Sequence, residues 1–335
     1  MAEEDQGASL GWARARELDV ENQRAWARAH ELDAEVRRLS ARVAELEEQI
    51  AQEKGMDIVP PAAESLCAVD AGTQLLLRYR FQELARQGSP LPQFSEVEFR
   101  NFSQNGEDGI LLYLFSLVGE ETRRAVEICA GDGIECNSAN FVINHGWTAL
   151  LVDGDQDKIS RGRSFYARCR DTWIWPPTMA EAWVTADNVN DLIRTHGFDG
   201  EIDLLSLDMD GVDYWIWKAI DCVSPRVVLL EYQDIWGPDR SVTVPYDQNF
   251  RAYWEGDFPD YGGASLAAFV KLGRQKGYRL VGCQRLGFNA IFLRNGVGDD
   301  IFPEIATGAC FTHPKVRQGI ETRLPRVVHL PWEEV

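Results

Sequence analysis

Apolar residues recur with a spacing of seven between residues 12 and 50. Two positions of this heptad, four residues apart, carry most of them: Leu18, Ala25, Leu32, Leu39 and Leu46 in one, and Ala29, Val36, Val43 and Ile50 in the other, whose first member is the polar Asn22. Leucine at one position and β-branched residues at the later members of the other favour a parallel two-stranded coiled coil. The pattern predicts an α-helical coiled coil over 12–54 and a homodimer. The alternative is a long amphipathic helix that packs on its own domain.

A linker and a further helix are predicted over 55–95, because Gly55 and Pro60-Pro61 interrupt the heptads. From residue 96 onward, short apolar runs alternate with segments that suit helices. The runs predicted as strands are 125–128, 148–152, 182–186, 202–207, 227–230, 278–284 and 289–294. Alternation of strands and helices indicates a parallel sheet, whereas the four-residue turn between the last two runs indicates an antiparallel hairpin. The predicted fold class is α/β: a doubly wound, seven-stranded Rossmann-like sheet over 96–335 that ends in a C-terminal antiparallel hairpin.

The turn after the first predicted strand is the first candidate for chemistry. A strand, a glycine turn, a helix and a second strand that ends on Asp153 are typical of a nucleotide-binding βαβ unit, in which the final acid accepts the ribose hydroxyls. A dinucleotide site has three glycines, but Cys129 replaces the first, and Asp132 would repel a pyrophosphate. The turn therefore favours a nucleoside without phosphates. S-adenosylmethionine fits, because Glu127 and Asp132 suit its ammonium group; the alternative is a turn that binds nothing.

Further polar residues lie near this turn in the predicted fold. Phe102–Gly109 (FSQNGEDG) precedes an apolar helix, which Ser103 or Asn105 could cap. Capping alone needs fewer polar residues, so Gln104 and Asn105 are candidates for contact with the cofactor. After the predicted third strand, Asp187 and Asn188 are candidates for the same role.

A cluster of acids follows the fourth predicted strand. Asp208, Asp210 and Asp213 fall within six residues, and Glu231 ends the next strand. Carboxylates at the carboxyl edge of a sheet repel one another unless a cation lies between them, and oxygen ligands suit Mg²⁺, Ca²⁺ or Mn²⁺. We expect Asp208, Asp210 and Glu231 to hold a divalent cation that binds and acidifies an acceptor hydroxyl, with Asp208 and Asp210 as catalytic residues. The alternative has Asp208 capping the next helix and Asp213 in solvent.

The composition narrows the classes of partner. The 335 residues carry a net charge of −19, which opposes binding to nucleic acid and to anionic membranes. No apolar run is long enough to span a bilayer, and the acidic start of the chain does not resemble a signal peptide, so we expect a cytoplasmic protein. Seven scattered cysteines without a CxxC pair indicate reduced thiols. No Ser/His/Asp or Cys/His arrangement suggests covalent hydrolysis.

Tryptophans gather in or near the loops beyond the strand ends. They include Trp173, Trp175, Trp215, Trp217, Trp236 and Trp254. Flat aromatic faces suit sugar rings, but large loops also need tryptophan to build small cores of their own.

Five segments together resemble the FkbM-type S-adenosylmethionine-dependent methyltransferases, in particular a bacterial subgroup associated with surface polysaccharides. They are FSQNGEDG (102–109), VEICAGDGIECN (126–137), LLVDGD (150–155), LSLDMDGVDYWIW (205–217) and the hairpin 277–295. The resemblance covers about residues 95 to 300, and the hairpin ending also suits a methyltransferase sheet. It implies a class I methyltransferase fold and O-methylation of a sugar or glycolipid. It further implies that Glu127, Gly131 and Gly133 contact the cofactor, Asp153 its ribose, and Asp208 and Asp210 the acceptor.

Two other functions remain open on the sequence. Asp208-Met209-Asp210 is also a DxD motif of the kind that holds a metal and a nucleotide-sugar diphosphate in glycosyltransferases. The chain could instead be a non-catalytic coiled-coil scaffold with a degenerate methyltransferase domain, for which Cys129 in the glycine turn is the best support.

Overall fold

The computed structural model describes residue 38, residues 69–252 and residues 258–335. The chain divides into two units, Met1–Val59 and Pro60–Val335, and nearly all described residues belong to the second. Apart from Arg38, the coiled coil predicted over 12–54 lies outside the described residues. Within them, no helix combines the length and the apolar character needed to cross a membrane.

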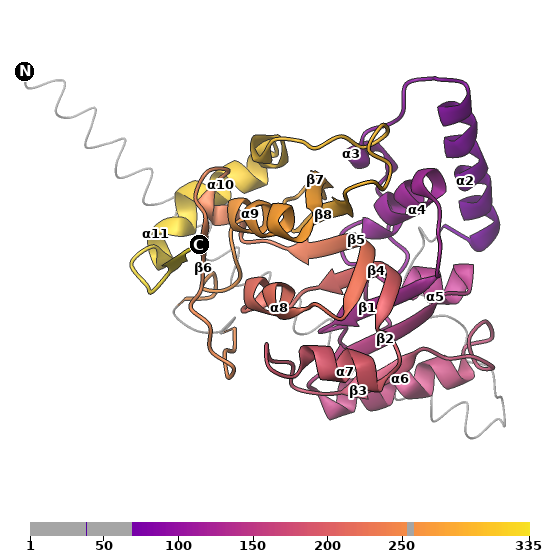
Figure 1. Cartoon of the computed structure of the whole chain (residues 1–335), viewed down its shortest axis with the longest axis horizontal. Coiled ribbons are helices and arrows are strands. Elements are labelled where there is room, and N and C mark those ends of the chain that lie inside the picture. Colours follow the sequence, from indigo (N-terminus) through magenta and orange to yellow (C-terminus); the bar gives the residue numbers. More distant parts are fainter. Residues whose placement is uncertain (1–37, 39–68, 253–257) are drawn as a thin grey trace, which may run out of the picture. The chain divides into compact units, whose positions relative to one another are not determined.

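A seven-stranded mixed sheet forms the centre of the second unit, in the order β3-β2-β1-β4-β5-β8-β7 (Figure 1). Its strands are β1 (Arg124–Ile128), β2 (Thr148–Asp153), β3 (Thr178–Glu181), β4 (Gly200–Leu207), β5 (Val223–Glu231), β7 (Tyr278–Cys283) and β8 (Asn289–Arg294). The first five are parallel, and β8 pairs antiparallel with both β5 and β7. The predicted doubly wound sheet with a hairpin ending is confirmed. The strand order reverses between β1 and β4, which is where open α/β sheets bind ligands.

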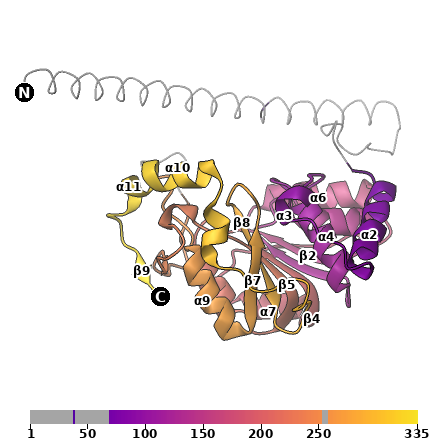
Figure 2. The same ribbon diagram turned by 90° about the horizontal axis from the view of Figure 1, so that it is seen from above.

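Helices cover both faces of this sheet. Figure 2 shows α4 and α6 on one side and α7 and α9 on the other. The helices are α2 (Ala71–Arg86), α3 (Phe94–Val97), α4 (Glu107–Val118), α5 (Ala139–His145), α6 (Gln156–Arg168), α7 (Val189–Thr195), α8 (Asp213–Ala219), α9 (Leu266–Lys276), α10 (Pro314–Thr322) and α11 (Leu324–Val327). Two short helical turns, η1 (Asp234–Trp236) and η2 (Thr307–Phe311), and a small sheet of β6 (Val242–Thr243) and β9 (Glu333–Glu334) complete the unit.

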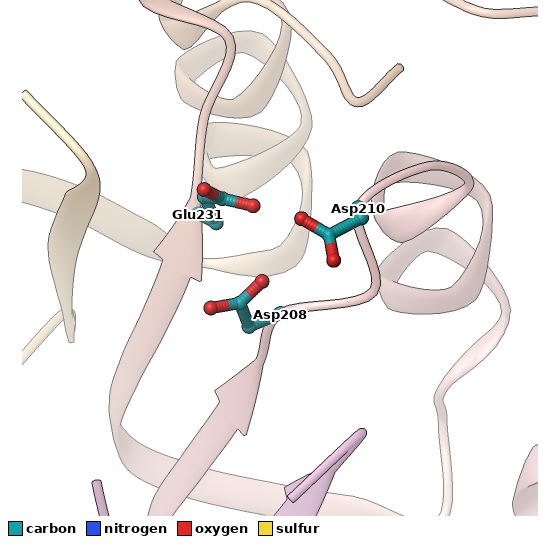
Figure 3. Close-up of side chains that lie close together, drawn as sticks. All are labelled: Asp208, Asp210 and Glu231. Carbon is teal, nitrogen blue, oxygen red and sulfur yellow. The ribbon is translucent and has the colours of Figure 1, made fainter. Parts of the chain in front are cut away.

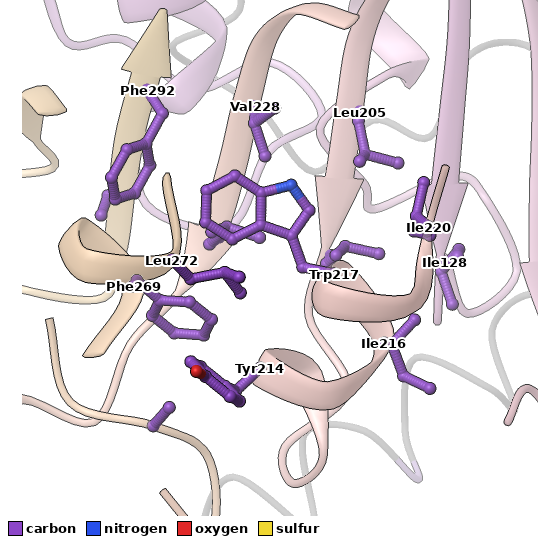
Figure 4. Close-up of a cluster of buried hydrophobic side chains, with 14 of the residues drawn as sticks. Ile128, Leu205, Tyr214, Ile216, Trp217, Ile220, Val228, Phe269, Leu272 and Phe292 are labelled. Carbon is purple, nitrogen blue, oxygen red and sulfur yellow. The ribbon is translucent and has the colours of Figure 1, made fainter. Parts of the chain in front are cut away.

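Buried side chains alternate between the two faces along each central strand, as parallel strands covered on both sides require. Trp217 of α8 is the largest side chain in the core on the α7–α9 side (Figure 4). Its ring centroid lies 5.4 Å from that of Phe292 and 5.9 Å from that of Tyr278. Trp217 is therefore a core residue and cannot line a sugar site.

The third strand differs from the prediction. It spans Thr178–Glu181 and pairs with Leu150–Asp153, whereas the sequence predicted 182–186. The side chain of Asn188 explains the difference. Its Oδ1 accepts from the Thr185 amide at 2.8 Å, and its Nδ2 donates to the Trp183 carbonyl at 2.9 Å. An asparagine side chain thus satisfies backbone groups that a strand would pair, and the segment becomes a turn.

A buried polar network joins α2 to α5. The amides of Gln74 and Asn140 bond to each other in both directions, at 3.0 and 2.9 Å, and Nε2 of His145 lies 2.7 Å from Oε1 of Gln74. Burial lowers the pKa of His145 to about 4, with smaller contributions from Arg78 and Arg123. The imidazole is therefore neutral in the folded protein at pH 5 and above.

This histidine should make the protein sensitive to acid. The unfolded state takes up the proton near pH 6.5, but the folded state does so only near pH 4. The contribution of His145 to stability is therefore complete above about pH 6.5 and is lost as the pH decreases. We expect a loss of up to about 2 kcal/mol between pH 7 and pH 5 from this residue. Urea unfolding of the wild type and of His145→Gln at both pH values measures it. Equal losses in the two proteins would contradict the assignment.

Candidate functional site

The turn after β1 has the backbone of a ligand-binding turn. Cys129, Gly131 and Gly133 have φ values of +62°, +60° and +71°. This left-handed region favours glycine, which explains why a nucleotide fingerprint has glycine where this chain has Cys129. The Gly131 amide donates to Oδ2 of Asp153 at 2.9 Å. The turn is thereby fixed to the carboxyl end of β2.

The two glycines of the turn have different roles. A Cβ atom built on Gly131 has no neighbour within 4 Å, whereas one on Gly133 would lie 2.7 Å from Cδ1 of Leu151. Gly133 is therefore required for the turn to pack on β2, and Gly131 faces open space, where a ligand can approach the backbone.

Glu127 and Asp132 both have partners within the protein. Glu127 is buried, and its two oxygens accept from the amides of Asn137 at 2.9 Å and Ser138 at 2.7 Å. These amides lie at the start of α5, where a dinucleotide fold would place its pyrophosphate. Asp132 forms an ion pair with Arg161 of α6 at 3.3 Å. Glu127 thus fills the anion-binding position with an internal carboxylate.

Asp153 lies at the carboxyl end of β2. One oxygen accepts from Gly131, and the other accepts from the Asp155 amide at 2.9 Å. The residue is 9% exposed, and each carboxylate oxygen has two acceptor sites, so the two amides leave one unused on each oxygen. Cys129 is exposed at the surface of the turn, but desolvation by the surrounding protein, followed by the carboxylates of Asp153, Asp213 and Asp208, raises the pKa of its thiol well above its usual range. This thiol is therefore neutral, and acids surround it.

Beyond the end of β3, Trp183 lies next to Gly154, whereas Asp187 and Asn188 do not. Asp187 is exposed and lies six residues beyond the strand, and Asn188 is engaged in the turn described above. The Trp183 side chain is 45% exposed, and its Cε3 would lie 3.2 Å from a Cβ atom on Gly154, next to Asp153. The Arg251 guanidinium lies 4.8 Å from its ring centroid. Trp183 was not among the predicted site residues because the apolar pattern places it inside the strand predicted over 182–186.

The FSQNGEDG segment is folded around its own acids. Asp108 is buried and accepts from three successive amides, those of residues 101–103, at 2.7 to 2.8 Å. Glu107 accepts from the Asn105 amide and from Nδ2 of Asn289 in β8. Ser103 Oγ accepts from the Asp108 amide at 3.0 Å, so Ser103 satisfies a free amide of the first turn of α4, and Asn105 does not. The Gln104 side chain is exposed.

The predicted metal ligands do come together (Figure 3). One oxygen from each of Asp208, Asp210 and Glu231 lies within 4.8 Å of the others. Desolvation and the charge of Asp210 raise the pKa of Asp208 to about 7, and desolvation and Asp208 raise that of Glu231 well above its usual range. Because the pKa values of both carboxyl groups are raised, the cluster retains a proton at neutral pH. A cation between these oxygens would compensate more of their charge than this proton does.

Asp213 is a structural residue, and the alternative that placed it in solvent is wrong. It is buried, and its carboxylate accepts from the amides of Met209 at 2.7 Å and Gly211 at 3.0 Å. Asp208 does not cap α8, whose N-cap is Val212 without a side-chain hydrogen bond. The loop after β4 is thus folded around Asp213, and it holds Asp210 at a φ of +56°. A non-glycine residue in this region stores strain of the kind found at functional sites.

The loop that contains Phe250 and Gly262 packs against the loop after β4. A Cβ atom on Gly211 would lie 2.4 Å from the Phe250 ring, and one on Gly262 would lie 2.5 Å from the Asp210 carbonyl oxygen. A small cavity of about 100 Å³ lies beside the acids, and Tyr261, Lys315 and Arg323 are among its other lining residues. The glycines allow the close approach of the loops that forms this cavity.

Fold and site together define an open α/β protein with a glycine turn and an acidic triad at the carboxyl ends of its parallel strands. An O-methyltransferase from Bacillus cereus, in complex with SAH, is similar in structure: 13% identical, with a TM-score of 0.39 over 69% of this chain and 94% of that one. An S-adenosylmethionine-dependent methyltransferase from Clostridium acetobutylicum is 10% identical, with a TM-score of 0.36 over 66% and 98%. No protein-family model and no curated protein matches the sequence.

Proposed function

We propose that the chain is an S-adenosylmethionine-dependent O-methyltransferase whose cofactor lies across the carboxyl ends of β1 and β2. The observation that carries this proposal is that the protein's own carboxylates occupy the amides of the turn. Gly131 donates to Asp153, and the first amides of α5 donate to Glu127. A diphosphate needs such donors free, whereas a cationic nucleoside is favoured by the acids.

The proposed cofactor residues have separate tasks. Asp153 accepts the ribose hydroxyls, Gly131 lets the ligand approach the backbone, and Trp183 forms a wall at the end of β3. Gln104 and Asn105 remain candidates for contact with the cofactor. When bound, S-adenosylmethionine supplies the methyl group. Methyl transfer depends mainly on in-line positioning, which a rigid crevice provides.

The acidic triad is proposed to hold a divalent cation next to the acceptor. Asp208, Asp210 and Glu231 offer only oxygen atoms, close enough together to contact one ion. Such an ion supplies Lewis acidity that lowers the pKa of an acceptor hydroxyl. A sugar or glycan acceptor is proposed on the sequence resemblance, and a homodimer on the heptads of 12–54.

A glycosyltransferase is the second candidate, because the triad includes the DxD acids Asp208 and Asp210. Isothermal titration with S-adenosylmethionine and with a panel of sugar nucleotides separates the two functions. Binding of a sugar nucleotide and not of S-adenosylmethionine would refute the proposal. Transfer of a labelled methyl group to glycan extracts, with and without chelator, then tests the acceptor class and the metal. Failure to bind either ligand would leave the scaffold hypothesis.

Trp183 offers a further test of the cofactor position. Stacking of a base on an aromatic side chain contributes about 1–3 kcal/mol. Because Arg251 lies over the ring, we expect the lower end of this range, a loss of about fivefold to tenfold in S-adenosylmethionine affinity for Trp183→Ala. Titration calorimetry measures it, with Trp175→Ala as a control for loss of an exposed tryptophan elsewhere. Equal affinities of the two variants would exclude Trp183 from the site.

A further inference from the structure

The loop between α6 and β3 presents three large apolar side chains to solvent. Trp173, Ile174 and Trp175 are 60%, 74% and 73% exposed. The loop itself is well fixed, because Thr172 is buried and its hydroxyl donates to the Tyr166 carbonyl at 2.8 Å. The Trp175 amide donates to the Thr172 carbonyl at 2.9 Å. The fold therefore holds these side chains outward, which costs solvation free energy unless a partner covers them.

Basic residues accompany this loop. Residues 156–175 have a net charge of +3, whereas the whole chain has a net charge of −19. The segment contains five basic residues, Lys158, Arg161, Arg163, Arg168 and Arg170, and two acidic ones, Asp157 and Asp171. Arg161 pairs with Asp132. Among the residues that the structure describes, no carboxylate lies within ion-pair distance of Arg168 or Arg170, and both are exposed. The charge next to the apolar side chains is thus positive.

We propose that Trp173, Ile174 and Trp175, with Arg168 and Arg170, form a surface that binds an anionic lipid bilayer. Tryptophan is favoured at the boundary of lipid and water, and basic residues beside it add attraction to anionic headgroups. The charge of the whole chain opposes such binding. At physiological salt, however, charges more than about 8 Å away are largely screened, so the local charge decides. Binding of this kind is peripheral and reversible.

The position of the surface separates it from the proposed methyltransferase site. Helix α6 begins directly after the carboxyl end of β2, and the loop that follows it leads into the amino end of β3, which is parallel to β2 (Figure 1). The lipid-binding surface and the crevice therefore lie toward opposite ends of the strands. Bound to a bilayer through this loop, the protein would present its crevice away from the lipid. The inference does not depend on the proposed function.

Co-sedimentation of the full chain with vesicles tests it. We expect binding to vesicles of phosphatidylcholine and phosphatidylglycerol (3:1) and much weaker binding to phosphatidylcholine alone. Trp173→Ala/Trp175→Ala should weaken binding at least about tenfold. Arg168→Gln/Arg170→Gln should weaken it about 25-fold on the anionic vesicles, at about fivefold for each charge. Leu76→Ala/Tyr79→Ala on α2 is the matched control, because these side chains are 68% and 57% exposed, and it should bind as the wild type does.

Three results would overturn the proposal. They are absence of binding by the wild type, equal binding to both kinds of vesicle, and unchanged binding by the tryptophan variant. If the tryptophan variant instead alters the molar mass of the protein in solution, the surface is a contact between proteins. All three double variants replace exposed side chains and should retain the wild-type melting temperature, which shows that any loss of binding is not a loss of folding.

Discussion

Replacing Asp153 with alanine is expected to weaken S-adenosylmethionine binding about 100-fold, since two hydrogen bonds to a charged group contribute on the order of 3 kcal/mol. Asp153 stands at the end of β2 with one acceptor site on each oxygen available to a ribose hydroxyl. The same substitution releases the Gly131 amide, so the turn also loses its attachment to β2. Both effects act on the same ligand.

Two variants separate these effects. Asp153→Asn keeps an oxygen for the Gly131 amide but loses the charge, and we expect an intermediate loss of affinity. Asp155→Ala is the matched control two residues away, because the Asp155 carboxylate caps α6 through the amides of Asp157 and Lys158. It should cost about 1 kcal/mol in unfolding free energy and leave the affinity unchanged. Wild-type affinity in Asp153→Ala, measured by titration calorimetry, would place the cofactor elsewhere.

The sheet was predictable because it depends on patterns that extend over many residues. Apolar runs such as 202–207 are buried on both faces of the sheet. A strand of this kind is apolar along its whole length, so the sequence identifies it readily. The third strand was misplaced because one side chain, Asn188, satisfies the backbone of the segment that looked most like a strand. Such a contact depends on the conformation of a turn, and a hydrophobic pattern does not record it.

The role of each acid in the site depends on local backbone geometry that the sequence pattern does not record. Glu127, Asp153, Asp208 and Asp213 all follow or end parallel strands, so all were expected at the same edge of the sheet. Which of them faces a ligand depends on which backbone amides are within reach. Glu127 accepts from amides at the start of the following helix, and Asp213 accepts from amides of the loop that precedes it. The Asp208 carboxylate instead lies close to those of Asp210 and Glu231. The position of an acid along a strand thus predicts that it lies at the carboxyl edge of the sheet. The conformation of the local turn determines whether it binds the protein's own amides or faces a ligand.

Removing one acid of the triad should change stability in opposite directions with and without metal. In the absence of a divalent cation, the raised pKa values mean that ionisation of Asp208 opposes folding, so stability falls as the pH rises through about 7. At pH 8, Asp208→Asn removes this charge, and we expect the variant to be more stable than the wild type by about 1–4 kcal/mol, the upper value corresponding to the whole rise of the pKa from 3.8 to about 7. Thermal unfolding in the presence of chelator measures the difference.

Added Mn²⁺ or Mg²⁺ should act in the opposite direction and favour the wild type. A cation at 100 times its dissociation constant stabilises the wild type by about 2.7 kcal/mol, whereas Asp208→Asn and Glu231→Gln should gain little, and methyl transfer should fall by about 100-fold to 1,000-fold in both. A third variant, Asp210→Asn, gives the clearest test, because asparagine also tolerates the left-handed backbone of this position, so that only the charge is removed. If the melting temperatures of wild type and variants rise equally with metal, the ion binds elsewhere. The triad would then be three acids that share protons, and the acceptor hydroxyl would have to lose its proton to another group.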